Sequence, residues 1–165
     1  PDPERCRRPS VGNAAEPYIY KPAESEVRWM GATSTHFLAT GALTGGVFGL
    51  VEESAKRGMS VPLHRHDLDV ESFYVLDGRI AFFLGNRSAS FASPGTFVHI
   101  PGGAIHGFRI ESDTARYLIL TTPRHVEFYR AITASSPEIA ITDDLIQRAC
   151  QEYGIAFIGA LPEPA

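Results

Sequence analysis

Two groups of glycines, histidines and one glutamate at linked spacings constrain the fold more than any other part of this chain. The first group reads Gly58-x5-His64-x-His66-x4-Glu71-x6-Gly78. After a gap of sixteen residues, the second group reads Gly95-x5-Pro101-x-Gly103-x2-His106. Three imidazoles and one carboxylate placed between glycines, on a background of β-forming residues, predict a metal site inside a β-structure.

The period of a β-strand explains the first spacing. Side chains alternate between the two faces of a strand, so His64 and His66 are predicted to point the same way, about 6.6 Å apart. A turn would then bring in Glu71 on the next strand. His106 must come from a more distant strand, after a turn at 101–103. Four such ligands leave one or two positions open on a five- or six-coordinate ion, as a catalytic site requires.

Each of these histidines, taken singly, is more often a hydrogen-bonded or surface residue than a ligand. The joint spacing favours one divalent metal ion, and the ligand set does not distinguish Fe, Mn, Ni, Co, Cu or Zn. A coordinated carboxylate that can swing free is placed to act as a general base, so Glu71 is also the predicted catalytic residue. His36 and His125 have no comparable context and are predicted to be structural or surface residues.

Composition excludes several classes of function. The 165 residues suit one domain with its own core, and 44% apolar with 21% charged residues is ordinary for a globular protein. A net charge of −4 without a basic stripe argues against a nucleic-acid partner. Cys6 and Cys150 form no metal-binding pair, which suits a cytoplasmic location. No apolar run approaches the roughly 18–20 residues of a membrane helix, so no membrane partner is expected.

Residues 1–16 are polar and proline-rich and are predicted to form a flexible N-terminal tail. Residues 17–165 are predicted to form one domain. Up to about residue 122, short runs rich in Val, Ile, Thr, Phe and Tyr alternate with turn residues, which indicates an all-β barrel or sandwich. Asp77-Gly78 predicts a hairpin that pairs the strand before it with the strand at 80–84.

The hydrophobic period changes after residue 122. Thr122-Pro123 is typical of a helix start, and this helix is predicted to run to about residue 133. A second helix is predicted from Thr142, with acidic residues in its first turn, to a stop at Gly154. The region 123–154 is therefore expected to be a helical cap packed on the barrel, and neither helix is assigned any chemistry.

Aromatic residues around the motif suggest an apolar pocket for a planar organic molecule. Phe73, Phe82, Phe97 and Phe108 are the candidate lining residues, although simple core packing is the alternative for each of them. His99 is a further pocket candidate. It faces away from the core if its two strand neighbours face inward, and it approaches the metal if that alternation slips.

The two groups resemble the paired motifs of the cupin superfamily, small β-barrels whose metal is held by three His and one Glu. The resemblance implies an all-β fold with a single cupin barrel, also called a double-stranded β-helix or jelly-roll, followed here by two C-terminal helices. It implies metal ligation by His64, His66, Glu71 and His106. The family often has Asn where this chain has Ile110, but that Asn is not a ligand. Without a second H-x-H the chain is expected to be a monocupin, and the family implies a homodimer.

Flanking segments at 44–52, 118–123 and 153–162 resemble the quercetin 2,3-dioxygenase-like cupins. In that family the substrate binds the metal through a deprotonated hydroxyl, the Glu ligand takes the proton, and dioxygen cleaves the ring. The resemblance therefore implies a metal-dependent dioxygenase acting on a flavonol or similar enolisable aromatic, with Glu71 as ligand and base. The alternatives are a non-oxidative metal-dependent cupin (an isomerase, lyase or polyketide cyclase) and a small-molecule-binding cupin without turnover. The complete ligand set counts against the latter.

Overall fold

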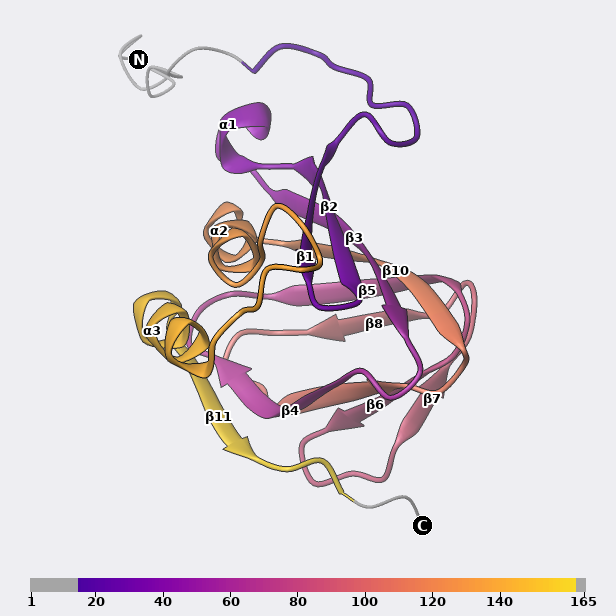
Figure 1. Cartoon of the computed structure of the whole chain (residues 1–165). Coiled ribbons are helices and arrows are strands. Elements are labelled where there is room, and N and C mark those ends of the chain that lie inside the picture. Colours follow the sequence, from indigo (N-terminus) through magenta and orange to yellow (C-terminus); the bar gives the residue numbers. More distant parts are fainter. Residues whose placement is uncertain (1–14, 163–165) are drawn as a thin grey trace, which may run out of the picture.

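Two antiparallel sheets make up most of the molecule in the computed structural model, which describes residues 15–162 (Figure 1). The first sheet has the strand order β1 (Glu26–Met30), β2 (Thr33–Ala39), β3 (Gly49–Lys56), β10 (Thr114–Thr121), β5 (Glu71–Asp77) and β8 (Phe97–Ile100). The second has the order β11 (Ile155–Gly159), β4 (Ser60–His66), β9 (His106–Ile110), β6 (Ile80–Leu84) and β7 (Ser90–Ala92). The expected all-β architecture is confirmed. Nearly all of the predicted tail lies outside the described residues.

The turn at Asp77-Gly78 does not make the predicted hairpin. β5 pairs with β10 and β8 in the first sheet, whereas β6 pairs with β9 and β7 in the second. The turn thus carries the chain from one sheet to the other. Gly78 has a φ of 81°, and a Cβ there would lie 2.3 Å from the carbonyl oxygen of Thr114. The predicted turn is therefore present, but a tight turn does not determine which strands pair.

Aromatic rings from both sheets form the centre of the core. Phe73 of β5 and Tyr117 of β10 meet Phe82 of β6 and Phe108 of β9. The ring centroids lie 5.1–6.0 Å apart, mostly in edge-to-face or tilted arrangements. Such aromatic pairs contribute about 0.5–1.5 kcal/mol each beyond their burial. This cluster holds the two sheets together and makes a wall behind the candidate site.

Three helices complete the chain: α1 (Gly41–Thr44), α2 (Pro123–Ala131) and α3 (Asp143–Tyr153). The predicted helix starts are confirmed, because the side chains of Thr122 and Thr142 accept hydrogen bonds from the first turns of α2 and α3. Gly154 ends α3 in the left-handed conformation, as predicted. α2 and α3 pack against each other, and the following strand β11 returns to pair with β4. No helix among the described residues is both long and apolar enough to cross a membrane.

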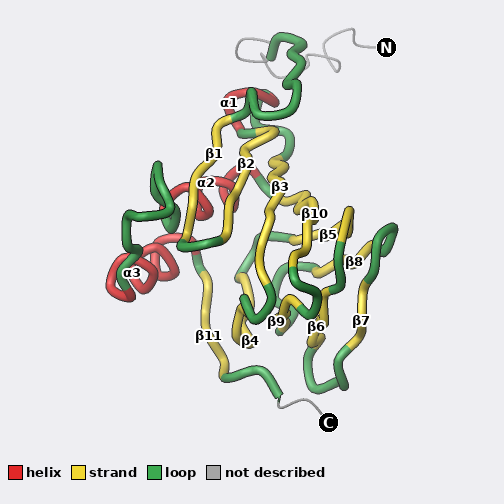
Figure 2. Tube along the Cα trace, turned by 45° about the vertical axis from the view of Figure 1, so that its right-hand side comes forward, coloured by secondary structure: helices red, strands yellow, loops and turns green. Residues whose placement is uncertain are grey.

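Figure 2 shows β1, β2 and β3 as an extension of the first sheet, with α2 behind them. The chain that follows α2 is tied to this extension, because Trp29 and Ala134 exchange two backbone hydrogen bonds of 2.8 Å. As a result, the N-terminal strands and the C-terminal helices lie around the same part of the barrel, where the candidate site is found.

Candidate metal centre

Three strands bring the four predicted ligands together. His64 and His66 lie on β4, Glu71 begins β5, and His106 begins β9. β4 and β9 are paired with His64 directly opposite His106. All four side chains are buried, and each offers a ligand atom within 4.8 Å of the others. The convergence predicted from the spacing is therefore present, and this buried cluster could bind a metal ion.

Backbone contacts orient the imidazole rings. Nδ1–H of His64 donates to the carbonyl of Pro62 over 2.8 Å, and Nδ1–H of His106 donates to that of Ala104 over 2.9 Å. Gly103, with a φ of 82°, lets its loop turn so that its N–H donates to the carbonyl of His66 over 2.7 Å. The loop before β9 is thus fastened to β4. These contacts leave the Nε2 atoms of His64 and His106 directed into the cluster.

The hydrogen-bond roles show that the cluster fits a cation. With its Nδ1–H committed to Ala104, His106 carries a lone pair on Nε2 unless the ring is doubly protonated. This Nε2 lies 2.9 Å from Oε2 of Glu71, and Nε2 of His66 lies 3.6 Å from the same oxygen. Two lone pairs facing each other at such a distance repel, so a proton or a metal ion must lie between them. One carboxylate and three imidazoles form a donor set that divalent transition metals accept.

Burial sets the charges of the cluster. It lowers the pKa of His64 below its usual value and the pKa of His66 to about 3, so both rings are neutral and available as ligands. Burial alone would raise the pKa of Glu71, but its contacts with His106 and His125 outweigh burial and hold that pKa well below the usual range. The site therefore combines the neutral imidazoles of His64 and His66 with the ionised carboxylate of Glu71, which is a suitable environment for a divalent cation.

Helix α2 contributes two residues that the sequence interpretation did not assign to the site. Nε2–H of His125 donates to Oε1 of Glu71 over 3.2 Å, and the hydroxyl of Tyr129 donates to the same oxygen through a short hydrogen bond. Burial, and then the charge of Glu71, raises the pKa of Tyr129 well above its usual value, so this phenol stays protonated. The two oxygens of Glu71 thus face different partners: Oε2 faces the histidine cluster and Oε1 faces α2. His125 was predicted to be a structural or surface residue; it is buried, and, unlike in the sequence interpretation, it lies in direct contact with the site.

An ion pair between the buried Asp69 and the half-exposed Arg124 fastens α2 to the loop that joins two of the ligands. Asp69 lies in the loop between β4 and β5, where Oδ1 accepts from the hydroxyl of Thr122 over 2.5 Å and Oδ2 accepts from Arg124 over 3.1 Å. The Arg124 guanidinium also donates to the carbonyls of Glu152 and Tyr153 at the end of α3. The loop that joins the ligands His66 and Glu71 is therefore connected to both helices.

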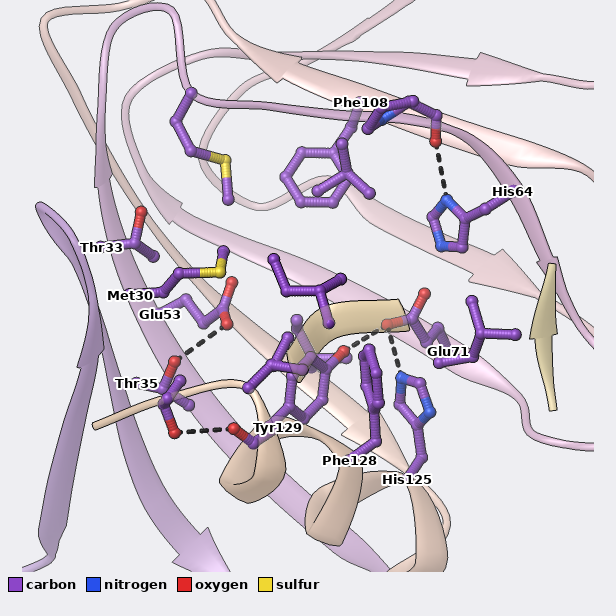
Figure 3. Close-up of a pocket in the computed structure, with 18 of the residues that line it drawn as sticks. Met30, Thr33, Thr35, Glu53, His64, Glu71, Phe108, His125, Phe128 and Tyr129 are labelled. Atoms are coloured by element: carbon purple, nitrogen blue, oxygen red, sulfur yellow. Dashed lines mark hydrogen bonds and ion pairs between the residues drawn. The ribbon is translucent and has the colours of Figure 1, made fainter. Parts of the chain in front are cut away.

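A cavity of about 230 Å³ opens beside the cluster, with His64, His66 and Glu71 in its wall (Figure 3). Much of the remaining wall is apolar and comes from both sheets, from the turn between β3 and β4, and from the region of α2 and α3. It includes Met59, Val61, Phe108, Ile119, Phe128, Ile132 and Ile146. Such a chamber, with few polar groups at defined places, is typical of a small-molecule site.

The predicted pocket residues divide into three groups. Phe108 lines the cavity. Phe73 and Phe82 are buried in the core behind it and do not reach its surface. Phe97 is 62% exposed on the outer face of β8, because the strand alternation that turns Val98 inward turns Phe97 outward. His99 shares that outer face and contacts the Ser72 hydroxyl at 2.8 Å, so neither Phe97 nor His99 reaches the cavity, and placing them there was wrong.

A second acidic side chain lines the cavity. Glu53 of β3 is buried and accepts hydrogen bonds from the hydroxyls of Thr35 and Tyr117 over 3.1 and 2.8 Å. Burial raises the pKa of Glu53 from 4.5 to about 7. Figure 3 shows Glu53 and Thr35 on one side of the cavity and His64 and Glu71 on the other. The strand alternation was a usable signal for this residue, since Glu53 shares the inward face of β3 with Val51 and Ala55.

Comparison with known proteins agrees with this description. The family described as "Cupin domain" matches residues 50–122, a range that includes all four clustered ligands and Glu53. Quercetin 2,3-dioxygenase from Bacillus subtilis is 25% identical over 121 residues, which are 73% of this chain. The chain spans only about a third of that relative's length, because the match covers 36% of it.

Solved structures show the same architecture. The polyketide cyclase RemF from Streptomyces resistomycificus has a TM-score of 0.57 and 23% identity, with 66% of this chain and 80% of that chain covered. KdgF from a Halomonas species has a TM-score of 0.58 and 17% identity, with 66% and 94% covered. An RmlC-like cupin from Shewanella frigidimarina has a TM-score of 0.59 and 14% identity, with 70% and 98% covered. From the sequence match, the two-sheet fold and the clustered motif residues, residues 50–122 of this chain form a cupin domain.

Proposed function

We propose that this chain is a metal-dependent dioxygenase of the quercetin 2,3-dioxygenase-like type, acting on a flavonol or a similar enolisable aromatic. The observation that supports metal-dependent catalysis most strongly is the set of three imidazoles and one ionised carboxylate beside a largely apolar cavity. The similarity to a quercetin 2,3-dioxygenase supports the oxidative reaction class.

His64, His66, Glu71 and His106 would hold one divalent ion. Such an ion would supply Lewis acidity, and with one carboxylate ligand it would keep a formal charge of +1 that favours an anionic oxygen of the substrate. The chain's own residues would perform the proton transfer. Glu71 is ionised and would accept the proton from the substrate hydroxyl, as a general base does.

Tyr129 and His125 would position this base. Their hydrogen bonds hold Oε1 of Glu71 against α2 while Oε2 faces the histidines. Rotation of the carboxylate toward a substrate would exchange these bonds for one to the substrate hydroxyl. The apolar wall formed by residues such as Phe108 and Phe128 would exclude water and accept the aromatic rings.

Oxygen consumption tests the proposal directly. The protein is stripped of metal and reconstituted separately with Fe, Mn, Ni, Co, Cu and Zn, and 3-hydroxyflavone or quercetin is added in an oxygen-electrode cell. We expect substrate-dependent oxygen uptake with at least one redox-active metal and none with zinc. Absence of uptake with every metal would overturn the dioxygenase assignment.

The non-oxidative alternative uses the same four ligands, which would hold zinc or manganese as a Lewis acid. The donor set alone favours neither reaction class. Anaerobic incubation separates them: conversion of an enolisable substrate without oxygen would favour an isomerase, lyase or cyclase, whereas strict oxygen dependence favours the dioxygenase.

A further inference from the structure

Glu53 occupies an unusual environment for a structural carboxyl group. It is buried on β3, and no lysine or arginine within residues 15–162 forms an ion pair with it. Within the same residues, its hydrogen-bond partners are the hydroxyls of Thr35 and Tyr117. An apolar side chain of similar size would fill this position without the cost of removing a carboxyl from water. Core packing therefore does not explain why an acidic side chain occupies this position.

The carboxyl group retains hydrogen-bonding capacity toward the cavity. Each of its oxygens accepts one bond, Oε1 from Thr35 and Oε2 from Tyr117, and a carboxyl oxygen can take part in a second. Tyr117 lies behind Glu53 and does not line the cavity, whereas Glu53 and Thr35 do. The unused capacity of Glu53 is thus available to a molecule inside the chamber.

The two carboxyl groups of the chamber lie at separate places: Glu71 is beside His64, and Glu53 is beside Thr35 (Figure 3). The other polar residues of the lining carry hydroxyl or imidazole groups: Thr33, Ser60, His66, His125, Tyr129 and Thr133. Apolar side chains, including Phe108 and Ile119, make up much of the lining that the two places share. A ligand that matches this distribution has an apolar body with one polar group at each end.

We propose that Glu53, supported by Thr35, is a second anchor that binds a neutral hydroxyl group on the ligand, remote from the group held at the histidine cluster. The inference rests on the proposed function for the position of the ligand's first end. It adds a substrate class: aromatic compounds with at least one additional hydroxyl on a ring distant from the metal-binding oxygen. Phenols fit this anchor because a hydroxyl both donates and accepts.

The protonation state of Glu53 is consistent with this class. Burial raises its pKa to about 7, so near neutral pH the group is present in both its protonated and its ionised forms. The protonated form can donate to and accept from a hydroxyl, and the ionised form can accept from it. A ligand with a carboxylate or phosphate at this end would place two like charges together in a buried site, so anionic groups are disfavoured.

Binding to the zinc-loaded protein tests the anchor without turnover. The probes are 3-hydroxyflavone, a series of analogues that each carry one extra ring hydroxyl, and the corresponding methyl ethers. We expect at least one hydroxylated analogue to bind about 3- to 10-fold more tightly than 3-hydroxyflavone, the gain of one hydrogen bond. Its methyl ether should lose this gain.

Variants assign the gain to Glu53. The double variant Glu53→Met with Tyr117→Phe replaces both partners of a buried hydrogen bond by apolar groups, which limits the loss of stability. In this variant the hydroxylated and parent compounds should bind equally. Tyr117→Phe alone, the matched control, leaves the carboxyl in place and should keep the preference. Zinc content and circular dichroism confirm that each variant is folded and loaded.

Three results would overturn the anchor: a preference that persists in the double variant, a wild-type protein that binds all analogues equally, or no binding of any probe. The oxygen-uptake assay is read separately. Selective binding without oxygen uptake would defeat the dioxygenase proposal and keep the anchor. Oxygen uptake without selective binding would support the dioxygenase proposal and overturn the anchor.

Discussion

Glu71 and Glu53 are two buried carboxyl groups on opposite sides of one cavity, and their surroundings give them opposite properties. Glu71 contacts His66 and His106 through one oxygen and His125 and Tyr129 through the other. Among residues 15–162, the hydrogen-bond partners of Glu53 are two hydroxyls. The pKa is therefore held low at Glu71 and raised to about 7 at Glu53.

The difference shows that burial does not decide the role of an acid by itself. Burial raises the pKa of both groups, but at Glu71 the imidazole contacts outweigh it. An ionised carboxylate can serve as a ligand and a base. A partly protonated carboxyl without a cation beside it is better suited to binding a neutral polar group.

The largest effect is expected from Glu71→Gln. The amide cannot accept a proton at neutral pH, so turnover should fall about 10²- to 10⁴-fold while part of the bound metal is retained. Steady-state oxygen uptake and metal analysis measure the two quantities. Glu52→Gln is the matched control, because Glu52 lies on β3 as an ion-pair partner of Arg116 and does not line the cavity. Wild-type turnover in Glu71→Gln would make Glu71 a passive ligand.

The next effect concerns the pH dependence of stability, which tests whether the pKa of Glu53 is raised while that of Glu71 is lowered. The folded-state pKa of Glu53 is raised from 4.5 to about 7. The protonated carboxyl therefore contributes fully to the free energy of unfolding below pH 4.5, and this contribution is lost as the pH rises through about 7. Glu53→Gln should remove this dependence, and the change across the window should be about 3 kcal/mol.

Denaturant unfolding at pH 4.5, 6 and 8 measures the free energy of unfolding of both proteins. The proteins are metal-free, because a bound cation would favour ionised Glu53. If the free energy of unfolding changes with pH in the same way in wild-type protein and in Glu53→Gln, burial does not raise the pKa of Glu53.

A smaller effect is expected from Tyr129→Phe, which removes the hydroxyl that holds Oε1 of Glu71. Loss of a hydrogen bond to a metal-binding residue typically costs about 10- to 100-fold in metal affinity or activity. Metal titration and oxygen uptake would show it, with thermal unfolding as the check on folding. Tyr74→Phe is the control, because Tyr74 lies on the outer face of β5. Equal metal affinity and activity in both variants would show that α2 does not position the carboxylate.

Strand alternation allowed much of the site to be predicted. The period of two is a local property, so the shared face of His64 and His66 on β4 followed from their spacing alone. The same reasoning placed Glu71 inward on β5. His106 required the spacing of the second motif as well, because its contact with His64 depends on the pairing of β9 with β4.

The remaining features depend on tertiary contacts that local patterns do not contain. His125 and Tyr129 are four residues apart and so share one face of α2, but only the docking of that helix brings this face to Glu71. Phe97 was assigned to the pocket because it is near the motif in the sequence, and strand alternation turns it outward. The turn at Gly78 was recognisable, whereas the separation of β5 and β6 into different sheets was not.

The central claim is that four side chains from β4, β5 and β9 hold one metal ion. Metal content by mass spectrometry, compared between wild-type protein and His106→Ala, tests it most directly, with His99→Ala as a matched control from the outer face. We predict about one divalent ion per chain in wild type and His99→Ala, and nearly none in His106→Ala, with unchanged circular dichroism in all three. Wild-type metal content in a folded His106→Ala protein would contradict the account.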